Sequence, residues 1–148
     1  MKLPKMKIKI ELGFFEVYII ELINVLKGHQ GPVTHLITNE YFIFSGSDDL
    51  NIIKWKLNFD NIKNNKLIES KNIIKAHDDV ITGLILHSDN CKLISSSFDK
   101  TIKIWDLKSL NNELTIKDQN KILDIFYYDK KIISIGTNNK VKIWNLNY

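Results

Sequence analysis

Two groups of side chains in this chain could support nucleophilic chemistry. Each group holds a histidine, a serine and an aspartate in that order, and the serine precedes the aspartate by four residues in both: His29, Ser45 and Asp49, then His77, Ser95 and Asp99. Side chains of these three types form the triad of serine hydrolases when they meet in space. Whether they could be catalytic therefore depends on which secondary-structure elements carry these residues and on whether the serine is exposed to solvent.

Pairs of neighbouring aspartates lie close to both groups. Asp48 and Asp49 are adjacent, as are Asp78 and Asp79. Two carboxylates side by side could supply an acid and a base, or could bind a cation. The alternative is that one aspartate shapes a turn while the others are charges on exposed loops, and we favour this alternative.

Both groups belong to an internal repeat. Three segments end in nearly the same phrase, and each follows a serine-containing strand and a turn with Asp or Asn six residues before the tryptophan: Ile52–Trp55, Ile102–Trp105 and Val141–Trp144. Repeats of this length are single supersecondary units that bury an apolar face only against their neighbours. The repeat therefore predicts a stacked β architecture.

The repeat resembles the WD-repeat family of β-propellers. Gly28-His29 opens the first unit and Ala76-His77 the second, and the units close with Trp55-Lys56, Trp105-Asp106 and Trp144-Asn145. The family pattern is a Gly-His, a Ser or Thr, a turn Asp and a closing Trp-Asp about 40 residues on. Only the middle unit keeps the Trp-Asp pair.

The resemblance implies a structural role for the Ser-His-Asp groups. In the family the His, Ser, Asp and Trp form a buried hydrogen-bonded tetrad, which here implies His29, Ser45, Asp49 and Trp55, then His77, Ser95, Asp99 and Trp105, and in the third unit Ser134, Asn138 and Trp144. The third unit has Asp118 in place of the histidine, so we expect its blade to be the least rigid. The histidines would orient strands and catalyse nothing.

The expected fold is all-β, a partial WD-repeat propeller of about three four-stranded antiparallel blades. We divide the single domain 1–148 into N-terminal strands that complete a blade (1–27), repeat one (28–75), repeat two (76–116) and a degenerate repeat three (117–148). An Asn- and Lys-rich insertion, Asn58–Asn65, widens the first tryptophan spacing to 50 residues against 39 for the second, and we expect it to be an exposed, mobile loop. Propellers have about four to eight blades, so three are too few to close a ring.

Three explanations of this shortfall stay open. The chain is a fragment of a longer WD-repeat protein, which we favour; or two copies form a six-blade ring, each N-terminal strand completing the other's last blade; or the blades dock onto another protein. One family branch, the ubiquitin-ligase substrate receptors, carries Trp-Asp-x-Arg where this chain has Trp105-Asp106-Leu107-Lys108. Lysine lacks the planar fork of arginine, which weakens that assignment.

The resemblance implies a scaffold that binds proteins or peptides through loops on one face. Family contact positions lie three and five residues after the histidine and one before the turn aspartate, which here implies Pro32, Thr34, Asp48, Val80, Thr82, Phe98, Lys121, Leu123 and Thr137. Phe98 is the strongest candidate because a large aromatic in a tight turn is typical of interface anchors. The alternative is that Phe98 packs against a neighbouring loop.

Composition argues against several other functions. The formal charge is +4, yet the lysines are scattered and alternate with isoleucines, as on a solvated strand face. A nucleic-acid platform would need clustered basic residues with aromatics between them, so we retain nucleic-acid binding only as the weaker alternative. The stretch Phe14–Leu26 carries Glu16 and Glu21 and is too short for a membrane span.

The sequence offers no motif for a cofactor or a metal. It has no Gly-x-Gly-x-x-Gly, no phosphate-loop lysine signature and no Gly-x-Ser-x-Gly elbow. His35 and His87 belong to no ligand spacing, and the single cysteine, Cys91, cannot form an internal disulfide. We therefore expect no cofactor, no metal and no catalysis, and an intracellular protein of the cytoplasm or nucleus.

Overall fold

The computed structural model describes residues 24–58, 67–87 and 91–146. In this part of the chain eleven strands form three antiparallel sheets, and there is no helix. We call the sheets blade 1, which is β1 (Val33–Thr38), β2 (Phe42–Ser47), β3 (Asn51–Leu57) and β4 (Ile68–Lys75); blade 2, which is β5 (Ile81–His87), β6 (Lys92–Ser97), β7 (Thr101–Asp106) and β8 (Asn112–Lys117); and blade 3, which is β9 (Ile122–Tyr128), β10 (Lys131–Gly136) and β11 (Val141–Asn145).

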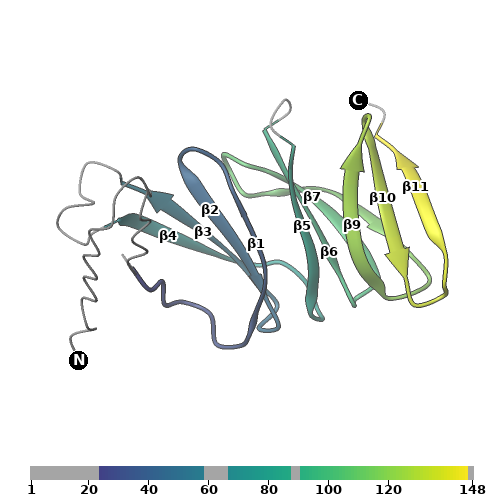
Figure 1. The fold of residues 1–148 in the computed structure, drawn as a ribbon, viewed down its shortest axis with the longest axis horizontal. Coiled ribbons are helices and arrows are strands. Elements are labelled where there is room, and N and C mark those ends of the chain that lie inside the picture. The colour runs from purple at the N-terminus through teal and green to yellow at the C-terminus, as the bar shows by residue number, and fades with distance from the viewer. Residues whose placement is uncertain (1–23, 59–66, 88–90, 147–148) are drawn as a thin grey trace, which may run out of the picture.

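The three blades stand side by side in an arc (Figure 1). Their first strands β1, β5 and β9 are neighbours, and each later strand pairs with the one before it. Blade 1 lies at one end of the arc and blade 3 at the other, so the ring is not closed. The predicted all-β, partial propeller is confirmed, although blade 3 has three strands among the described residues. The N-terminal strands were predicted over 1–27; residues 1–23 lie outside the described part, as does most of the Asn58–Asn65 loop, and residues 24–27 form no strand.

Tight turns join the second and third strands of every blade. Each contains one residue with positive φ, at Leu50 (71°), Lys100 (70°) and Asn139 (59°). In blades 1 and 2 the aspartate before this residue holds the turn: Asp49 Oδ1 accepts from the backbone N–H of Asn51 at 3.0 Å, and Asp99 Oδ1 makes the equivalent bond in blade 2. Short polar side chains bond to their own turn in this way, and the recurring aspartate in the sequence reflects it.

The apolar core lies between the blades rather than within one of them. Between blades 1 and 2 it consists of Phe44, Ile52, Ala76, Ile81, Leu84, Leu93 and Trp105, and between blades 2 and 3 of Ile94, Ile102, Ile104, Ile122, Ile125 and Ile132. Side chains of a strand alternate between the two faces of its sheet, so blade 2 is apolar on both faces. No blade buries its apolar residues alone, as expected for a repeat protein.

Polar groups also join adjacent blades. The hydroxyl of Thr34 donates to the carbonyl of Ile81 at 2.8 Å, and the hydroxyl of Thr82 donates to that of Ile122 at 2.8 Å. Lys54 reaches from blade 1 to the carbonyl of Leu107 at 2.6 Å, with its ammonium over a phenylalanine ring of its own sheet. These bonds fix the position of one blade on the next, beyond what apolar contact specifies.

Candidate functional site: the tetrads and the turn face

The tetrad of blade 2 is a continuous buried chain of hydrogen bonds. Trp105 Nε1 lies 2.9 Å from Ser95 Oγ, which lies 2.7 Å from His77 Nε2, and His77 Nδ1 lies 2.7 Å from Asp99 Oδ2. Strands β6 and β7, the turn between them and the loop before β5 each supply one of these four side chains, so the chain of bonds holds these elements in one register. Ser95 is fully buried, and the His77 side chain is as well.

The direction of each bond follows from the chemistry of the groups. A carboxylate only accepts, so His77 Nδ1–H donates to Asp99, and His77 Nε2 then accepts the Ser95 O–H. One lone pair of Ser95 Oγ accepts the Trp105 N–H. Burial raises the pKa of Asp99, but hydrogen bonds from His77, Thr101 and the Asp78 backbone outweigh it and hold this pKa well below its ordinary 3.8.

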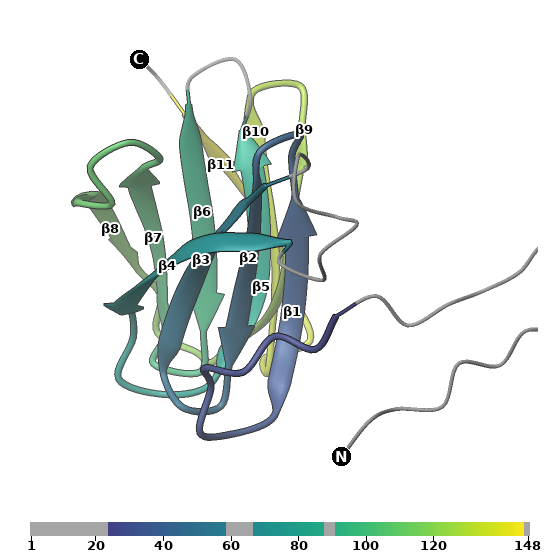
Figure 2. The ribbon, with the colours of Figure 1, turned by 90° about the vertical axis from the view of Figure 1, so that its left-hand side faces the viewer.

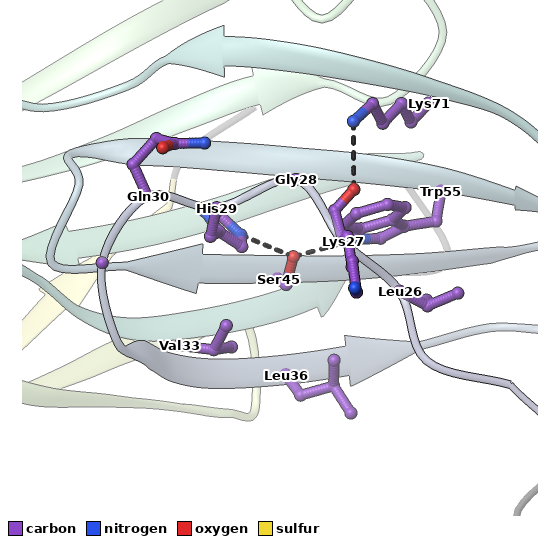
Figure 3. A pocket seen from close by; sticks show the side chains of 11 residues that line it. Leu26, Lys27, Gly28, His29, Gln30, Val33, Leu36, Ser45, Trp55 and Lys71 are labelled. Atoms are coloured by element: carbon purple, nitrogen blue, oxygen red, sulfur yellow. Dashed lines mark hydrogen bonds between the residues drawn. The ribbon is translucent and has the colours of Figure 1, made fainter. Parts of the chain in front are cut away.

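Blade 1 holds an equivalent tetrad. His29 joins Ser45 at 2.8 Å and Asp49 at 2.9 Å, and Trp55 Nε1 donates to Ser45 at 2.8 Å. Burial raises the pKa of Asp49, but the backbone N–H of Gln30 and the His29 side chain lower it more, and the net pKa is below the ordinary value. The tetrad borders a hollow of about 740 Å³ on the face that blade 1 turns away from blade 2, with Leu36 and Lys71 among its lining (Figure 3).

The segment before β1 covers part of this face. Figure 2 shows it running across the front of blade 1, and Gly28 lies so close to the Trp55 ring that an added Cβ would meet it at 2.7 Å. Glycine at this position therefore has a steric reason in blade 1. Lys71 holds the same segment by donating to the carbonyl of Lys27 at 3.1 Å.

Blade 3 has an ion pair in place of the hydrogen bonds that the histidine makes in blades 1 and 2. Trp144 Nε1 still donates to Ser134 Oγ at 2.9 Å, but Asp118, at the histidine position, accepts two hydrogen bonds from Lys142 Nζ at 2.6 and 2.7 Å. The Asp118 side chain is only 5% exposed. Burial raises its pKa, but the bond from Lys142 and the backbone N–H of Asn120 lower it more, so its pKa lies below the ordinary value. Asn138 stays in the turn, where it accepts from the Lys140 backbone at 3.2 Å.

The tetrads contain the Ser–His–Asp series of hydrogen bonds that a hydrolase triad has, but their serines are poorly placed for nucleophilic attack. The Ser45 oxygen accepts the Trp55 N–H, its O–H is directed to His29, and the residue is buried. The same arrangement recurs in blade 2, where Ser95 has no exposed surface. A nucleophile has to reach its substrate, so the repetition favours a structural role.

The predicted partner contacts gather at the end of the blades that carries the tight turns. One hydrogen bond occurs three times there, each at 3.0 Å: from Asp48 N–H to the Pro32 carbonyl, from Phe98 N–H to that of Val80, and from Thr137 N–H to that of Lys121. We call these six residues the turn face. They join the turn after the second strand to the residue leading into the first strand of the same blade.

The other three predicted contacts, Thr34, Thr82 and Leu123, are the second residues of β1, β5 and β9. Thr82 is buried, and its hydroxyl bonds to Ile122 in the next blade. The hydroxyl is thus already used between blades, and a partner contact at Thr82 stays a prediction. Thr34 makes the equivalent bond to Ile81, whereas Leu123 has no hydroxyl to give and is exposed.

A small cluster joins blades 2 and 3 on the turn face. The ammonium of Lys121 lies 4.9 Å from the centre of the half-buried Phe98 ring, and 3.1 Å from Asp79 Oδ2. The backbone N–H of Val80 and then the bond from Lys121 hold the pKa of Asp79 below its ordinary value. Sequence reasoning named Phe98 and Lys121 but treated Asp79 only as a loop charge. The contact between two repeats is not visible in the spacing of either one.

The described residues contain no group of three histidine, cysteine or carboxylate side chains arranged to hold a metal. Within the same part of the chain, no helix has the length and apolar character needed to cross a membrane.

Comparison with known proteins gives two matches to one family model, described as "WD domain, G-beta repeat", at residues 20–56 and 68–106. The chain is 32% identical over 94 residues to the small ribosomal subunit protein RACK1 of Candida albicans, covering 62% of this chain and 29% of that protein. It is 33% identical over 108 residues to a UDP-galactose:fucoside alpha-3-galactosyltransferase of Dictyostelium discoideum, covering 73% of this chain and 16% of that protein. The chain thus spans less than a third of these relatives' length.

A solved structure titled "Structure of U3-55K" superposes with a TM-score of 0.68. The match covers 83% of this chain and 38% of that chain, at 24% identity. At this identity the likeness concerns the fold.

Proposed function

Because the chain belongs to the WD40 repeat family, we propose that it is a non-catalytic scaffold that binds a partner protein or peptide through the turn face. The proposal rests on the hydrogen bond that recurs in all three blades between the tight turn and the residue leading into the first strand. It holds the exposed residues of all three turns on rigid strands, and a rigid platform loses little conformational entropy when it binds. The three repeats, 28–75, 76–116 and 117–148, would act as one domain.

Phe98 is the proposed anchor. Its ring is half-buried under the Lys121 ammonium, so the packing alternative accounts for one part of its surface and leaves the other part open. Aromatic side chains at the centre of an interface contribute disproportionately to binding. Asp48 and Asp78 are exposed at the same end, and they suit a partner that presents basic groups around an apolar anchor.

The test uses peptides selected from a displayed random library on the immobilised chain. Their affinities are measured by fluorescence anisotropy for the unmodified chain, for Phe98→Ala and for Tyr128→Ala. Tyr128 is the matched control because it is an exposed aromatic at the opposite end of β9. We expect Phe98→Ala to weaken binding about tenfold or more, equivalent to about 1.4 kcal/mol, with little change in melting temperature. Equal affinities for the two variants would contradict the proposal.

The absence of catalysis is part of the proposal and has its own test. A fluorophosphonate probe labels activated serines, and we expect it to leave Ser45 and Ser95 unmodified because tryptophan and histidine already occupy their hydroxyls. Covalent labelling of either serine in the folded chain would contradict the scaffold assignment. One relative matched over a short part of its length carries an enzyme name, which makes this test informative.

Nucleic-acid binding stays the weaker alternative. Many strand and turn lysines are already neutralised by carboxylates, including Lys92 by Glu113 at 2.7 Å and Lys56 by Glu69 at 2.9 Å. Binding that survives moderate salt in a gel-shift assay would favour this alternative, because phosphate contacts alone weaken steeply with salt. A place in the cytoplasm or nucleus belongs to the same proposal as the scaffold role.

A further inference from the structure

The two ends of the arc expose apolar faces. We call the face that blade 1 turns away from blade 2 the leading face, with Val33, Leu36, Ile43 and Trp55, and the face that blade 3 turns away from blade 2 the trailing face, with Phe126, Ile133, Ile135, Val141 and Ile143. Several of these residues are large, apolar and more than half exposed. They lie at opposite ends of the molecule (Figure 1).

The leading face repeats a surface that is buried twice elsewhere in the chain. Leu36, Leu84 and Ile125 each pair with the tetrad serine of their own blade, so they occupy equivalent positions. Leu36 is 67% exposed, whereas Leu84 and Ile125, covered by the preceding blade, are 9% and 4% exposed. Val33 is likewise exposed where its equivalent Ile81 is buried.

The trailing face repeats the other half of the same interface. Ile143 and Ile104 each precede the tetrad tryptophan by one residue, and they are 66% and 2% exposed. Val141 is three residues before its tryptophan and is exposed, whereas Ile52 and Ile102 at that position are fully buried. Within residues 24–146, as far as the structure describes them, the chain thus builds one kind of blade junction twice and leaves the two matching halves of a third junction uncovered.

We propose that a second copy of this chain supplies the missing blade at each end. The trailing face of one copy would pack on the leading face of the other, and the same contact would form again on the far side of a two-fold axis. Two arcs of three blades would then form a closed ring of six, within the range of known propellers. A single copy cannot bring its own two faces together, because they lie at opposite ends of the arc.

The proposed junction differs from the internal ones in two respects. Leu123 stands where Thr34 and Thr82 donate to the carbonyl of the next blade, so the junction between copies lacks this hydrogen bond. Ile135 is the equivalent of Gly46, which lies so close to Ile81 in the next blade that a Cβ added to the glycine would be 2.7 Å from the Ile81 side chain. In the proposed junction Ile135 would instead face Val33, the smaller equivalent of Ile81. Apolar contact therefore has to carry this junction, and we expect association that depends on protein concentration.

The test measures the mass of the 148-residue chain by sedimentation and by light scattering. We expect twice the 17.3 kDa of one chain. Phe126→Glu on the trailing face and Leu36→Lys on the leading face should each halve that mass. Ile37, the equivalent of Phe126, packs in the same core as Leu84, the equivalent of Leu36, so the two substituted positions should approach each other. Tyr41→Lys, an exposed aromatic in the β1–β2 turn, is the control and should stay dimeric.

Mixing the two monomeric variants identifies the geometry. A head-to-tail pair would contain one unmodified junction and one in which Glu faces Lys, so the mixture should recover the dimer mass. A monomeric unmodified chain would overturn the proposal. So would a dimer broken by only one of the two variants, which indicates contact between identical faces, or a species that grows beyond two copies. Peptide binding at Phe98 is measured on the same variants, so the scaffold proposal can survive the loss of this one.

Discussion

The tetrad serines allow two equivalent bonds to be compared within one molecule. Ser95→Ala removes the acceptor of the Trp105 N–H and the donor to His77 Nε2, both of them buried. A buried polar group left without its partner costs about 1–3 kcal/mol, so we expect this variant to lose about 2–4 kcal/mol of unfolding free energy. Ser134→Ala removes only the bond to the half-buried Trp144, whose N–H can reach water, and we expect a loss of about 1 kcal/mol.

The assay is urea unfolding followed by tryptophan fluorescence and by far-ultraviolet circular dichroism. All variants are compared at one protein concentration, because association adds to apparent stability. Ser70→Ala, at an exposed position of β4, is the control and should change stability by less than about 0.5 kcal/mol. Equal losses for Ser95→Ala and Ser134→Ala would refute the reasoning, because they would mean that the histidine contributes nothing to the network.

Two further predictions concern the carboxylates. Lys142→Met leaves Asp118 buried without its cation, and we expect a loss of about 1–3 kcal/mol in urea unfolding; the double variant Lys142→Met with Asp118→Asn should recover most of it, and no recovery would argue against the ion pair. The folded pKa of Asp99 is lowered, so its stabilising effect is complete above about 4 and is lost as the pH falls below 3.8 toward the folded value. Between pH 5 and pH 2, the unfolding free energy measured in urea should therefore fall less steeply for Asp99→Asn than for the unmodified chain. An equal pH dependence of this free energy in the two proteins would count against the linkage.

The sequence predicted the strands well because two independent signals agreed. Alternation of isoleucine with lysine marks strands such as β7, and the fixed interval from serine to tryptophan sets the register of the hairpin that contains both, as in the pairing of Ser45 with Ile53. The position of the turn aspartate followed from the same interval.

The sequence could not show contacts between segments that lie far apart in the chain. Asp118 appeared as a defect of the third tetrad, because its partner Lys142 lies 24 residues away and has no counterpart in the family pattern. Thr82 appeared to be a surface contact, because its use between blades depends on the position of the next inner strand. Both results arise from contacts between segments distant in sequence, where the local period carries no information.

The ion pair in blade 3 also changes the expectation that this blade is the least rigid. Rigidity in a tetrad comes from the bonds that tie the loop before the first strand to the hairpin behind it. In blade 2 the link runs through His77 to Ser95 and Asp99; in blade 3 Lys142 on β11 holds Asp118 in the equivalent loop. The loop is therefore tied to the third strand rather than to the second, and the turn residue Asn138 is released from the network. Hydrogen exchange should accordingly find the Asn138 turn opening more readily than the Asp99 turn, while the amides after Asp118 stay protected. Equal exchange at the two turns would mean that the aspartate in blade 2 acts on its own turn alone.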